Sequence, residues 1–254
     1  MKNVWITSGL LSALLLSGCG GSSEKKAEAP AEAPAAAPID TANAGTVTGK
    51  VAFAGQAPAA RTISMDATPA CARAHSTPQR SEEVIVNSNG TLKNAFVYVK
   101  AGLPQREWPV TAPAAKLDQQ GCIYTPHVLG VQANQDIEIT NSDPTNHNIH
   151  PLPKVNREWN ESQPPKGEAK TKQFPREEIM IPVKCNVHPW MRSYIGVVSH
   201  PYFAVTGDDG SFTIPNLPPG EYTLATWHEK YGEQEQKITV GPKESKTVEF
   251  SYKG

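Results

Sequence analysis

The chain has 254 residues and a formal net charge of −1, from 24 basic and 25 acidic side chains. This balance leaves no basic footprint, so electrostatic binding of nucleic acid is excluded as the expected function. The 19 glycines and 23 prolines favour short strands and tight turns over long helices.

The first residues have the features of a targeting segment. Lys2 supplies a short positive region, and residues 4–16 form an apolar run that is too short for a permanent membrane span. The segment LSGC, which ends at Cys19, resembles a bacterial lipobox. The resemblance implies a signal peptide at 1–18 and a lipidated Cys19, whereas an ordinary secretory signal with an incidental cysteine is the alternative. We therefore expect an exported, lipid-anchored protein at the periplasmic face of the outer membrane or at the cell surface.

Residues 19–45 are a biased mixture of Ser, Lys, Glu, Ala and Pro. Such a composition has too few large apolar groups to offset the entropy of ordering, so we expect a disordered tether. About 210 residues remain, which is enough for one large β domain or two small ones.

Short runs of alternating or β-branched residues recur along this remainder, separated by Gly, Pro, Asn and Asp. The predicted strands lie at 46–53, 83–86, 91–100, 131–140, 178–185, 194–198, 202–207, 211–217, 221–227, 236–240 and 247–252. Residues 151–173 are polar and contain proline, and we expect them to form an exposed excursion. The pattern predicts an all-β protein built from β-sandwiches.

Three cysteines follow the lipobox, namely Cys71, Cys122 and Cys185. Disulfides persist in exported proteins, and an odd number of cysteines leaves one sulfur with another role. Because Cys185 lies in a ligand-like motif, a Cys71–Cys122 disulfide is expected. A metal cluster of these two cysteines with His75 and His127 is the alternative, although its spacing is not a usual zinc pattern.

That motif is CNVHPWM, which places Cys185, His188 and Met191 three residues apart on a tight loop between two predicted strands. A thiolate, an imidazole and a thioether form a soft ligand set. A second imidazole is available from His147, which follows a predicted strand and the turn-forming run Asn-Ser-Asp-Pro. One cysteine and two histidines with a weak axial methionine are the ligands of mononuclear type 1 copper sites, so the sequence predicts one copper ion.

Other chemistries fit this motif less well. A closed structural zinc site would recruit a second cysteine rather than a thioether. A nucleophilic Cys185 activated by His188 has no evident acidic or amide partner and leaves Met191 unexplained. A binuclear copper centre needs a second cysteine in the loop, and a degenerate, metal-free loop is the remaining alternative.

The segment CNVHPWMR resembles the ligand loop of the cupredoxins, the small blue copper proteins, and is most similar to their short, amicyanin-like form. NSDPTNHNIH resembles their first-histidine segment, and YTPHVLGVQANQDIEITN their second and third strands. The resemblance covers roughly 92–198 and implies a Greek-key β-sandwich with the four ligands given above. It also implies that Asn148 ties the two ligand loops together. Lys184 departs from the family pattern, which usually has a hydroxyl or aromatic residue before the cysteine.

The C-terminal segment AVTGDDGSFTIPNLPPGEYTLATWHEKYGEQ is similar to the carboxypeptidase regulatory-like β-sandwich. GTVTGKVAFAGQAPAA resembles the first strand of the same module. We therefore expect an N-terminal β segment at 46–90, a copper domain at 91–199 and a second small sandwich at 200–254. The first and last of these together form one sandwich if the copper domain is inserted between them. The run LKNAFVYVK fits either domain.

These features predict a membrane-tethered carrier of single electrons. Its expected partner is a redox protein, such as a cytochrome c or a membrane respiratory complex, that touches the apolar rim near His188. Copper storage or scaffolding without redox cycling is the alternative, although only 4 methionines are present. An enzyme is not expected, because four protein ligands leave no open coordination position. No role is assigned to the other histidines, which are His75, His127, His150, His200 and His228.

Overall fold

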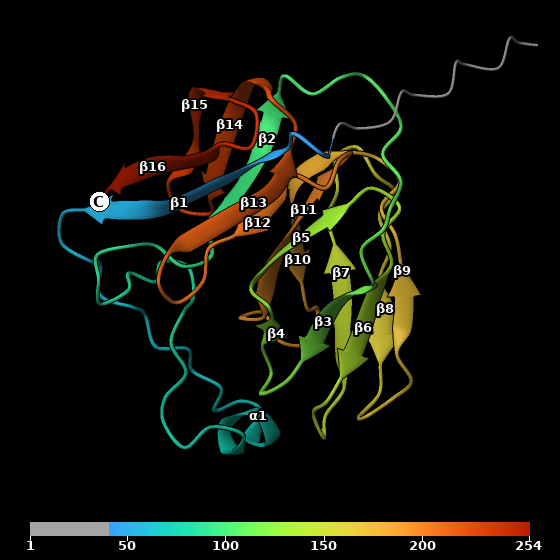
Figure 1. Ribbon diagram of the computed structural model, residues 1–254. Coiled ribbons are helices and arrows are strands. Elements are labelled where there is room, and N and C mark those ends of the chain that lie inside the picture. Colours follow the sequence, from blue (N-terminus) through green and yellow to red (C-terminus); the bar gives the residue numbers. More distant parts are fainter. Residues whose placement is uncertain (1–40) are drawn as a thin grey trace, which may run out of the picture. The chain divides into compact units, whose positions relative to one another are not determined.

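The structure, a computed structural model, describes residues 41–254. The predicted signal peptide, the lipidation site at Cys19 and most of the predicted tether lie outside these residues. Strands dominate the described part, whose one α-helix is the short α1 (Pro69–Arg73) (Figure 1). The prediction of an all-β fold is confirmed. Among the described residues, no helix has the length and apolar character needed to cross a membrane.

Two β-sandwiches make up the fold, and the first contains strands from both ends of the described chain. Its three-stranded sheet has the order β13 (Ser211–Leu217), β1 (Gly45–Ala54) and β16 (Ser245–Lys253). Its four-stranded sheet has the order β12 (Phe203–Val205), β2 (Phe96–Ala101), β14 (Gly220–His228) and β15 (Gly232–Val240). Side chains of both sheets form one buried cluster. We call this unit the flanking sandwich.

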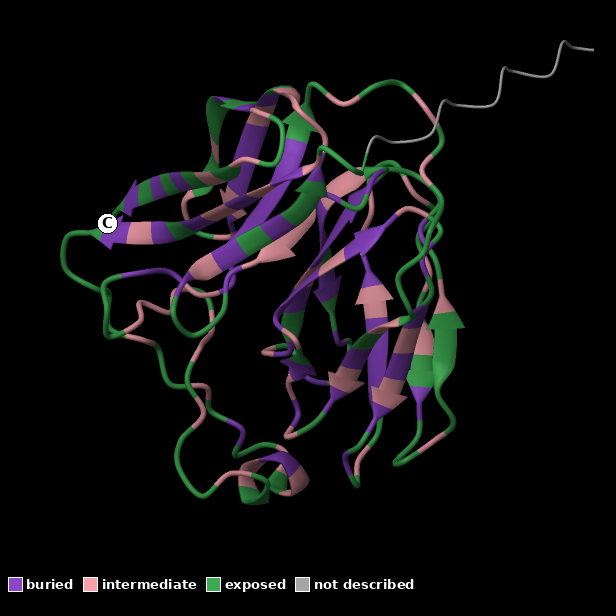
Figure 2. Ribbon diagram, viewed as in Figure 1, coloured by how far each residue is buried: buried purple, intermediate pink, exposed green. Residues whose placement is uncertain are grey.

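Strand β1 shows how the sequence pattern builds this sheet. Its residues alternate between buried and more exposed, and Val47 and Val51 are fully buried. The same alternation runs along β16, which pairs with β1 in parallel (Figure 2). Gly49 is required at the centre, because a Cβ there would lie 1.9 Å from the carbonyl oxygen of Val248. The N-terminal strand therefore belongs to the C-terminal sandwich.

The second sandwich, which we call the inserted sandwich, comprises β3 to β11. Its five-stranded sheet has the order β5 (Val128–Gln132), β11 (Arg192–Val198), β10 (Glu178–Lys184), β7 (His147–Pro151) and β8 (Glu161–Gln163). Its four-stranded sheet has the order β4 (Tyr124–Thr125), β3 (Ala115–Gln119), β6 (Ile137–Asn141) and β9 (Lys170–Lys172). A separate buried cluster fills the space between these sheets.

The structure differs from two sequence expectations in this region. Strand β2 pairs with β12 and β14, so the segment that fitted either domain lies in the flanking sandwich. The predicted boundary of the copper domain at 91 is therefore too early. The stretch 151–173 also contains β8 and β9, which pair with β7 and β6. These are short, polar edge strands, and their sequence lacks the apolar alternation by which strands are recognised.

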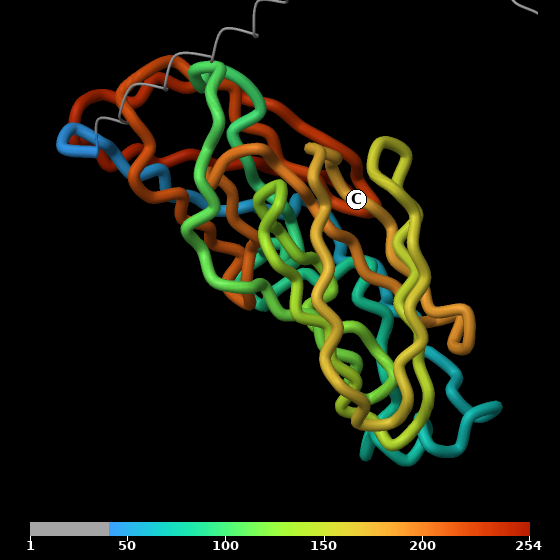
Figure 3. The backbone as a smooth tube through the Cα atoms, turned by 90° about the vertical axis from the view of Figure 1, so that its right-hand side faces the viewer, coloured from blue at the N-terminus to red at the C-terminus, as the bar shows by residue number. Residues whose placement is uncertain are grey.

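Between β1 and β2 the chain leaves the flanking sandwich and crosses to one end of the inserted sandwich. We call this crossing segment, residues 58–82, the strap. Pro69 opens α1, where the missing N–H of proline costs nothing. Met65 and Cys71 of the strap are buried in the core of the inserted sandwich. Figure 3 shows the strap beside the loop ends of that sandwich. The predicted N-terminal β segment at 46–90 is thus divided between the two sandwiches.

Candidate metal centre

The predicted ligands come together at one end of the inserted sandwich, because the strands that carry them are neighbours. Strand β7 begins at His147, which follows the loop from β6. Strand β10 ends one residue before Cys185, and β11 begins one residue after Met191. Both β7 and β11 pair with β10, so the two ligand loops meet at the same edge.

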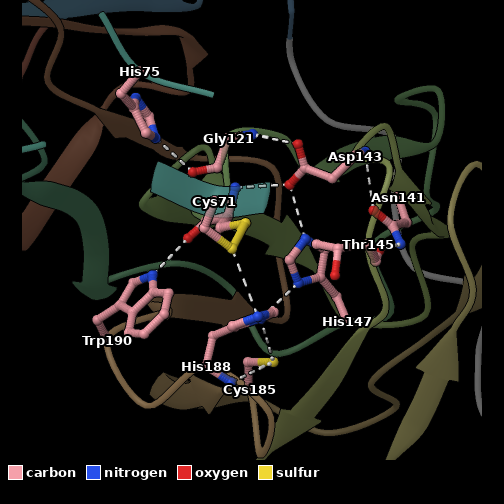
Figure 4. Close-up of a disulfide and its surroundings, with 11 residues drawn as sticks. Cys71, His75, Gly121, Asn141, Asp143, Thr145, His147, Cys185, His188 and Trp190 are labelled. Atoms are coloured by element: carbon pink, nitrogen blue, oxygen red, sulfur yellow. Dashed lines mark hydrogen bonds and ion pairs between the residues drawn. A yellow bond between two sulfur atoms is a disulfide. The ribbon is translucent and has the colours of Figure 1, made fainter. Parts of the chain in front are cut away.

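Three donor atoms converge within this end (Figure 4). The Nδ1 atoms of His147 and His188 are 2.9 Å apart, and the Cys185 Sγ atom lies 3.9 Å from the His188 Nδ1 atom. The three side chains are buried, and their ligand atoms all lie within 4.8 Å of one another. Two imidazole nitrogens and one sulfur gathered this closely form a set suited to a soft metal ion.

The loop that carries Cys185 and His188 is closed by its own backbone. The Met191 N–H donates to the His188 carbonyl at 3.0 Å, and the Cys185 N–H donates to the Met191 carbonyl at 3.3 Å. The His188 N–H points at the Cys185 sulfur at 3.4 Å. Met191 is buried in the same core cluster as Cys185. These hydrogen bonds fix the backbone that carries both ligands.

Asn148 joins the two ligand loops, as the family resemblance implied. Its Oδ1 atom accepts a hydrogen bond from the Asn186 N–H at 2.6 Å and lies 3.2 Å from the Cys185 sulfur. Its amide nitrogen donates to Asn160 at 2.6 Å. The loop after β10 is thus bound to the start of β7 through one side chain.

Sequence reasoning missed Asp143. Its Oδ2 atom lies 2.8 Å from the Nε2 atom of His147, and its carboxylate also accepts from the N–H groups of Gly121 and Cys122, both at 2.7 Å. A carboxylate behind a metal-binding imidazole fixes its tautomer and orientation. With the carboxylate beside Nε2, the Nδ1 atom is the nitrogen of His147 that faces His188 and the proposed ligand cluster. A carboxylate four residues before a histidine in a loop has no distinctive pattern, so no sequence signal marked it.

The electrostatics favour the metal-binding forms of two ligands. Burial opposes ionisation of the Cys185 thiol, but hydrogen bonds from His147 and from backbone N–H groups outweigh it and hold its pKa below the usual value. Burial, reinforced by the charge on His147, lowers the pKa of His188. A thiolate and a neutral imidazole are the forms that coordinate metals.

The outer edge of His188 is covered. The structure joins Cys71 and Cys122 in a disulfide, the pairing expected from the sequence, and the Cys71 Sγ atom lies 3.6 Å from the His188 Nε2 atom. His188 is only 1% exposed. The expected contact of a partner with the rim at His188 is therefore blocked on this side by the strap.

Trp190 is the half-buried residue of the ligand loop. Its ring centroid is 5.1 Å from that of His188, and its Nε1–H donates to the Cys122 carbonyl at 3.0 Å. Trp190 also lines a cavity of about 520 Å³ between the loop and the strap, whose walls include Arg61 and Arg192. This tryptophan links the buried imidazole to the surface.

The five other histidines all have partners outside this cluster. Their partners are the Gly121 carbonyl for His75, Glu229 for His127, Glu158 for His150, the Val99 carbonyl for His200 and the Lys230 N–H for His228. With Cys71 and Cys122 bonded to each other, the alternative cluster with His75 and His127 does not form.

Comparisons with known proteins give three results. Residues 196–253 match the model of the carboxypeptidase regulatory-like domain, which confirms the predicted module. No curated protein matches the chain. A purple cupredoxin from Nitrosopumilus maritimus is a similar solved structure, with 20% identity over 33% of this chain and 98% of its own, at a TM-score of 0.29.

Two further solved structures are similar. A variant of amicyanin in its Cu(I) form has 23% identity over 41% of this chain and 98% of its own, at a TM-score of 0.30. A copper-containing nitrite reductase from Thermus scotoductus SA-01 has 19% identity over 36% of this chain, at a TM-score of 0.29. This chain spans 25% of the length of that reductase.

Proposed function

We propose that this protein binds one mononuclear type 1 copper ion and carries single electrons. The observation that supports this most directly is the buried convergence of the Nδ1 atoms of His147 and His188 with the sulfur of Cys185. This is the trigonal set of a blue copper site, and Met191 would be its weak axial ligand. Copper would supply the one-electron couple, and the protein holds the ligands.

Electron transfer suits this site better than catalysis does. The ligand loop is closed by hydrogen bonds and its ligand side chains are buried, so both oxidation states would meet nearly the same ligand geometry. Catalysis at a metal requires an open coordination position for substrate or water. Four protein ligands in a buried site leave none, and we therefore propose a carrier and not an enzyme.

The carrier would act outside the cytoplasm. A lipid anchor at Cys19 would hold it at the periplasmic face of the outer membrane or at the cell surface. Its partner would be a redox protein, such as a cytochrome c or a membrane respiratory complex, and not a nucleic acid. Because the strap covers the edge of His188, the partner would approach the half-buried Trp190.

An optical spectrum tests the copper site. The protein loaded with Cu(II) should show an intense visible thiolate-to-copper band, and Cys185→Ser should abolish it. The double variant Cys71→Ser/Cys122→Ser is the matched control, because it removes two sulfurs but keeps the ligands, and it should retain the band. A band that survives loss of Cys185 would show that the assignment is wrong.

Cyclic voltammetry tests the function of the site. A carrier should give a reversible one-electron wave and keep its copper through repeated cycles. An irreversible wave, or loss of copper on reduction, would contradict the carrier and favour storage or scaffolding.

A further inference from the structure

The two nitrogens of the His188 imidazole face two different sulfur groups (Figure 4). Nδ1 faces the Cys185 sulfur at 3.9 Å, and Nε2 faces the Cys71 sulfur at 3.6 Å. The sulfurs of Cys71 and Cys122 and a nitrogen of His188 form a second buried group whose ligand atoms all lie within 4.8 Å. The disulfide thus occupies a position from which two thiolates would reach the same imidazole.

We propose that the dithiol form of this protein binds a second soft metal ion through Cys71, Cys122 and His188. A disulfide is a poor ligand, because the thiolate is the form that coordinates metals. Reduction by a dithiol transfers two electrons and two protons to the bridge, and the dithiol becomes a disulfide in exchange. Metal binding then displaces the two thiol protons, leaving two thiolates and one imidazole, a set that suits Cu(I), Zn(II) or Cd(II).

The surroundings hold this geometry without the sulfur–sulfur bond. The Cys122 N–H donates to Asp143 at 2.7 Å, and its carbonyl accepts from the Trp190 indole at 3.0 Å. Cys71 is fully buried on α1. The neighbouring Met65 is buried in the same core of the inserted sandwich. Contacts other than the disulfide bond therefore hold both cysteines in place.

The second site shares only His188 with the copper site of the proposed function. A neutral imidazole has one nitrogen free to bind, so both nitrogens coordinate together only if the ring loses its remaining proton. Filling the second site should consequently weaken binding at the first. Closing the disulfide removes the second site and leaves His188 to the first.

The test uses the full chain with Cys185→Ser, which lacks the key ligand of the copper site, so its outcome does not depend on the proposed function. The protein is reduced, freed of reductant without oxygen, and titrated with Cd(II). The dithiol form should bind one Cd(II) per chain with an ultraviolet thiolate-to-cadmium band, and the disulfide form should bind none. Adding Cys71→Ser should abolish the band.

Adding His188→Gln to the same background tests the imidazole. It should lower the affinity for Cd(II) by about 100-fold or more, since loss of a mere hydrogen-bond partner of a ligand costs about 10- to 100-fold. Equal affinity with and without His188 would overturn the proposal, because two thiols alone would then account for binding. Absence of binding by the dithiol form would overturn it as well.

Near-ultraviolet circular dichroism shows whether the reduced chain remains folded. The dithiol form should keep the native aromatic signal before Cd(II) is added. A reduced chain that binds Cd(II) yet stays without native signal would contradict a preformed site.

Discussion

The Nε2 atom of His147 and the Oδ2 atom of Asp143 are 2.8 Å apart, and both side chains are buried. The same carboxylate accepts hydrogen bonds from the backbone N–H groups of Gly121 and Cys122. Asp143 therefore connects the His147 imidazole to the loop that carries Cys122. Burial opposes ionisation of Asp143, but these hydrogen bonds outweigh it and hold its pKa below the usual value. The carboxylate is therefore ionised and can accept a hydrogen bond from the Nε2 atom of His147.

Asp143→Asn should weaken copper binding by about 10- to 100-fold, the usual effect of removing a carboxylate behind a ligand histidine. The amide is a weaker acceptor and no longer enforces the Nδ1-free tautomer. Competition with a chelator measures the affinity. Asp136→Asn is the matched control, because Asp136 is exposed and, in the described structure, its carboxylate accepts a hydrogen bond from the Gln173 amide, away from the ligand cluster. A similar loss in both variants would contradict the role of Asp143.

Asn148→Ala should lower the free energy of unfolding of the metal-free protein by about 1–3 kcal/mol, because the Asn186 N–H loses its acceptor. Urea unfolding measures the change. Asn160→Ala is the control, since it removes only the outer partner of the Asn148 amide and should cost less. Equal losses would show that the bridge between the ligand loops contributes nothing specific.

Met191→Gln should retain copper, lower the reduction potential and change the colour, because the axial group tunes blue copper sites. The backbone hydrogen bonds of Met191 close the loop and do not depend on its side chain. Voltammetry and the visible spectrum give the result. Met180→Leu changes a methionine of a different core cluster and should leave the potential unchanged. An unshifted potential in Met191→Gln would remove Met191 from the ligand set.

His228 should make stability depend on pH. Burial lowers the pKa of His228 to about 4, whereas an unfolded histidine titrates near 6.5. Between these two pH values, His228 is therefore protonated in the unfolded chain but neutral in the folded chain. The resulting stability is full above about pH 6.5 and is lost as the pH falls toward 4.

When the pH falls from about 7.5 to 5, this effect should lower the free energy of unfolding of the wild type by about 2 kcal/mol. His228→Asn keeps an acceptor for the Lys230 N–H but cannot take up the proton, so its loss over the same range should be smaller by that amount. Urea unfolding at both pH values measures the difference. Parallel changes in the two proteins would rule His228 out.

The sequence predicted the features that depend on local spacing. Short alternating runs gave the all-β class, and the three-residue spacing of Cys185 and His188 placed both on one loop. Counting cysteines paired Cys71 with Cys122, but nothing local shows that a bridge spanning 51 residues lies against His188. The run at β2 is buried on both faces at Phe96 to Val99, so it suits either sandwich. The route of the chain between the two sandwiches and the packing of the folded protein decided these two points, and the local sequence pattern encodes neither.

The parallel pairing of β1 with β16 has a consequence for the order of assembly. Nine consecutive pairs join the first described strand to the last, so this sheet closes only after the chain between them is brought together. Contacts of such separation carry a high entropic cost and form late. The inserted sandwich needs only shorter closures, and we expect it to fold before the flanking sandwich does. The metal-binding end of the molecule would then exist before the fold is complete, and a chain cut just before Ser245 should still build it.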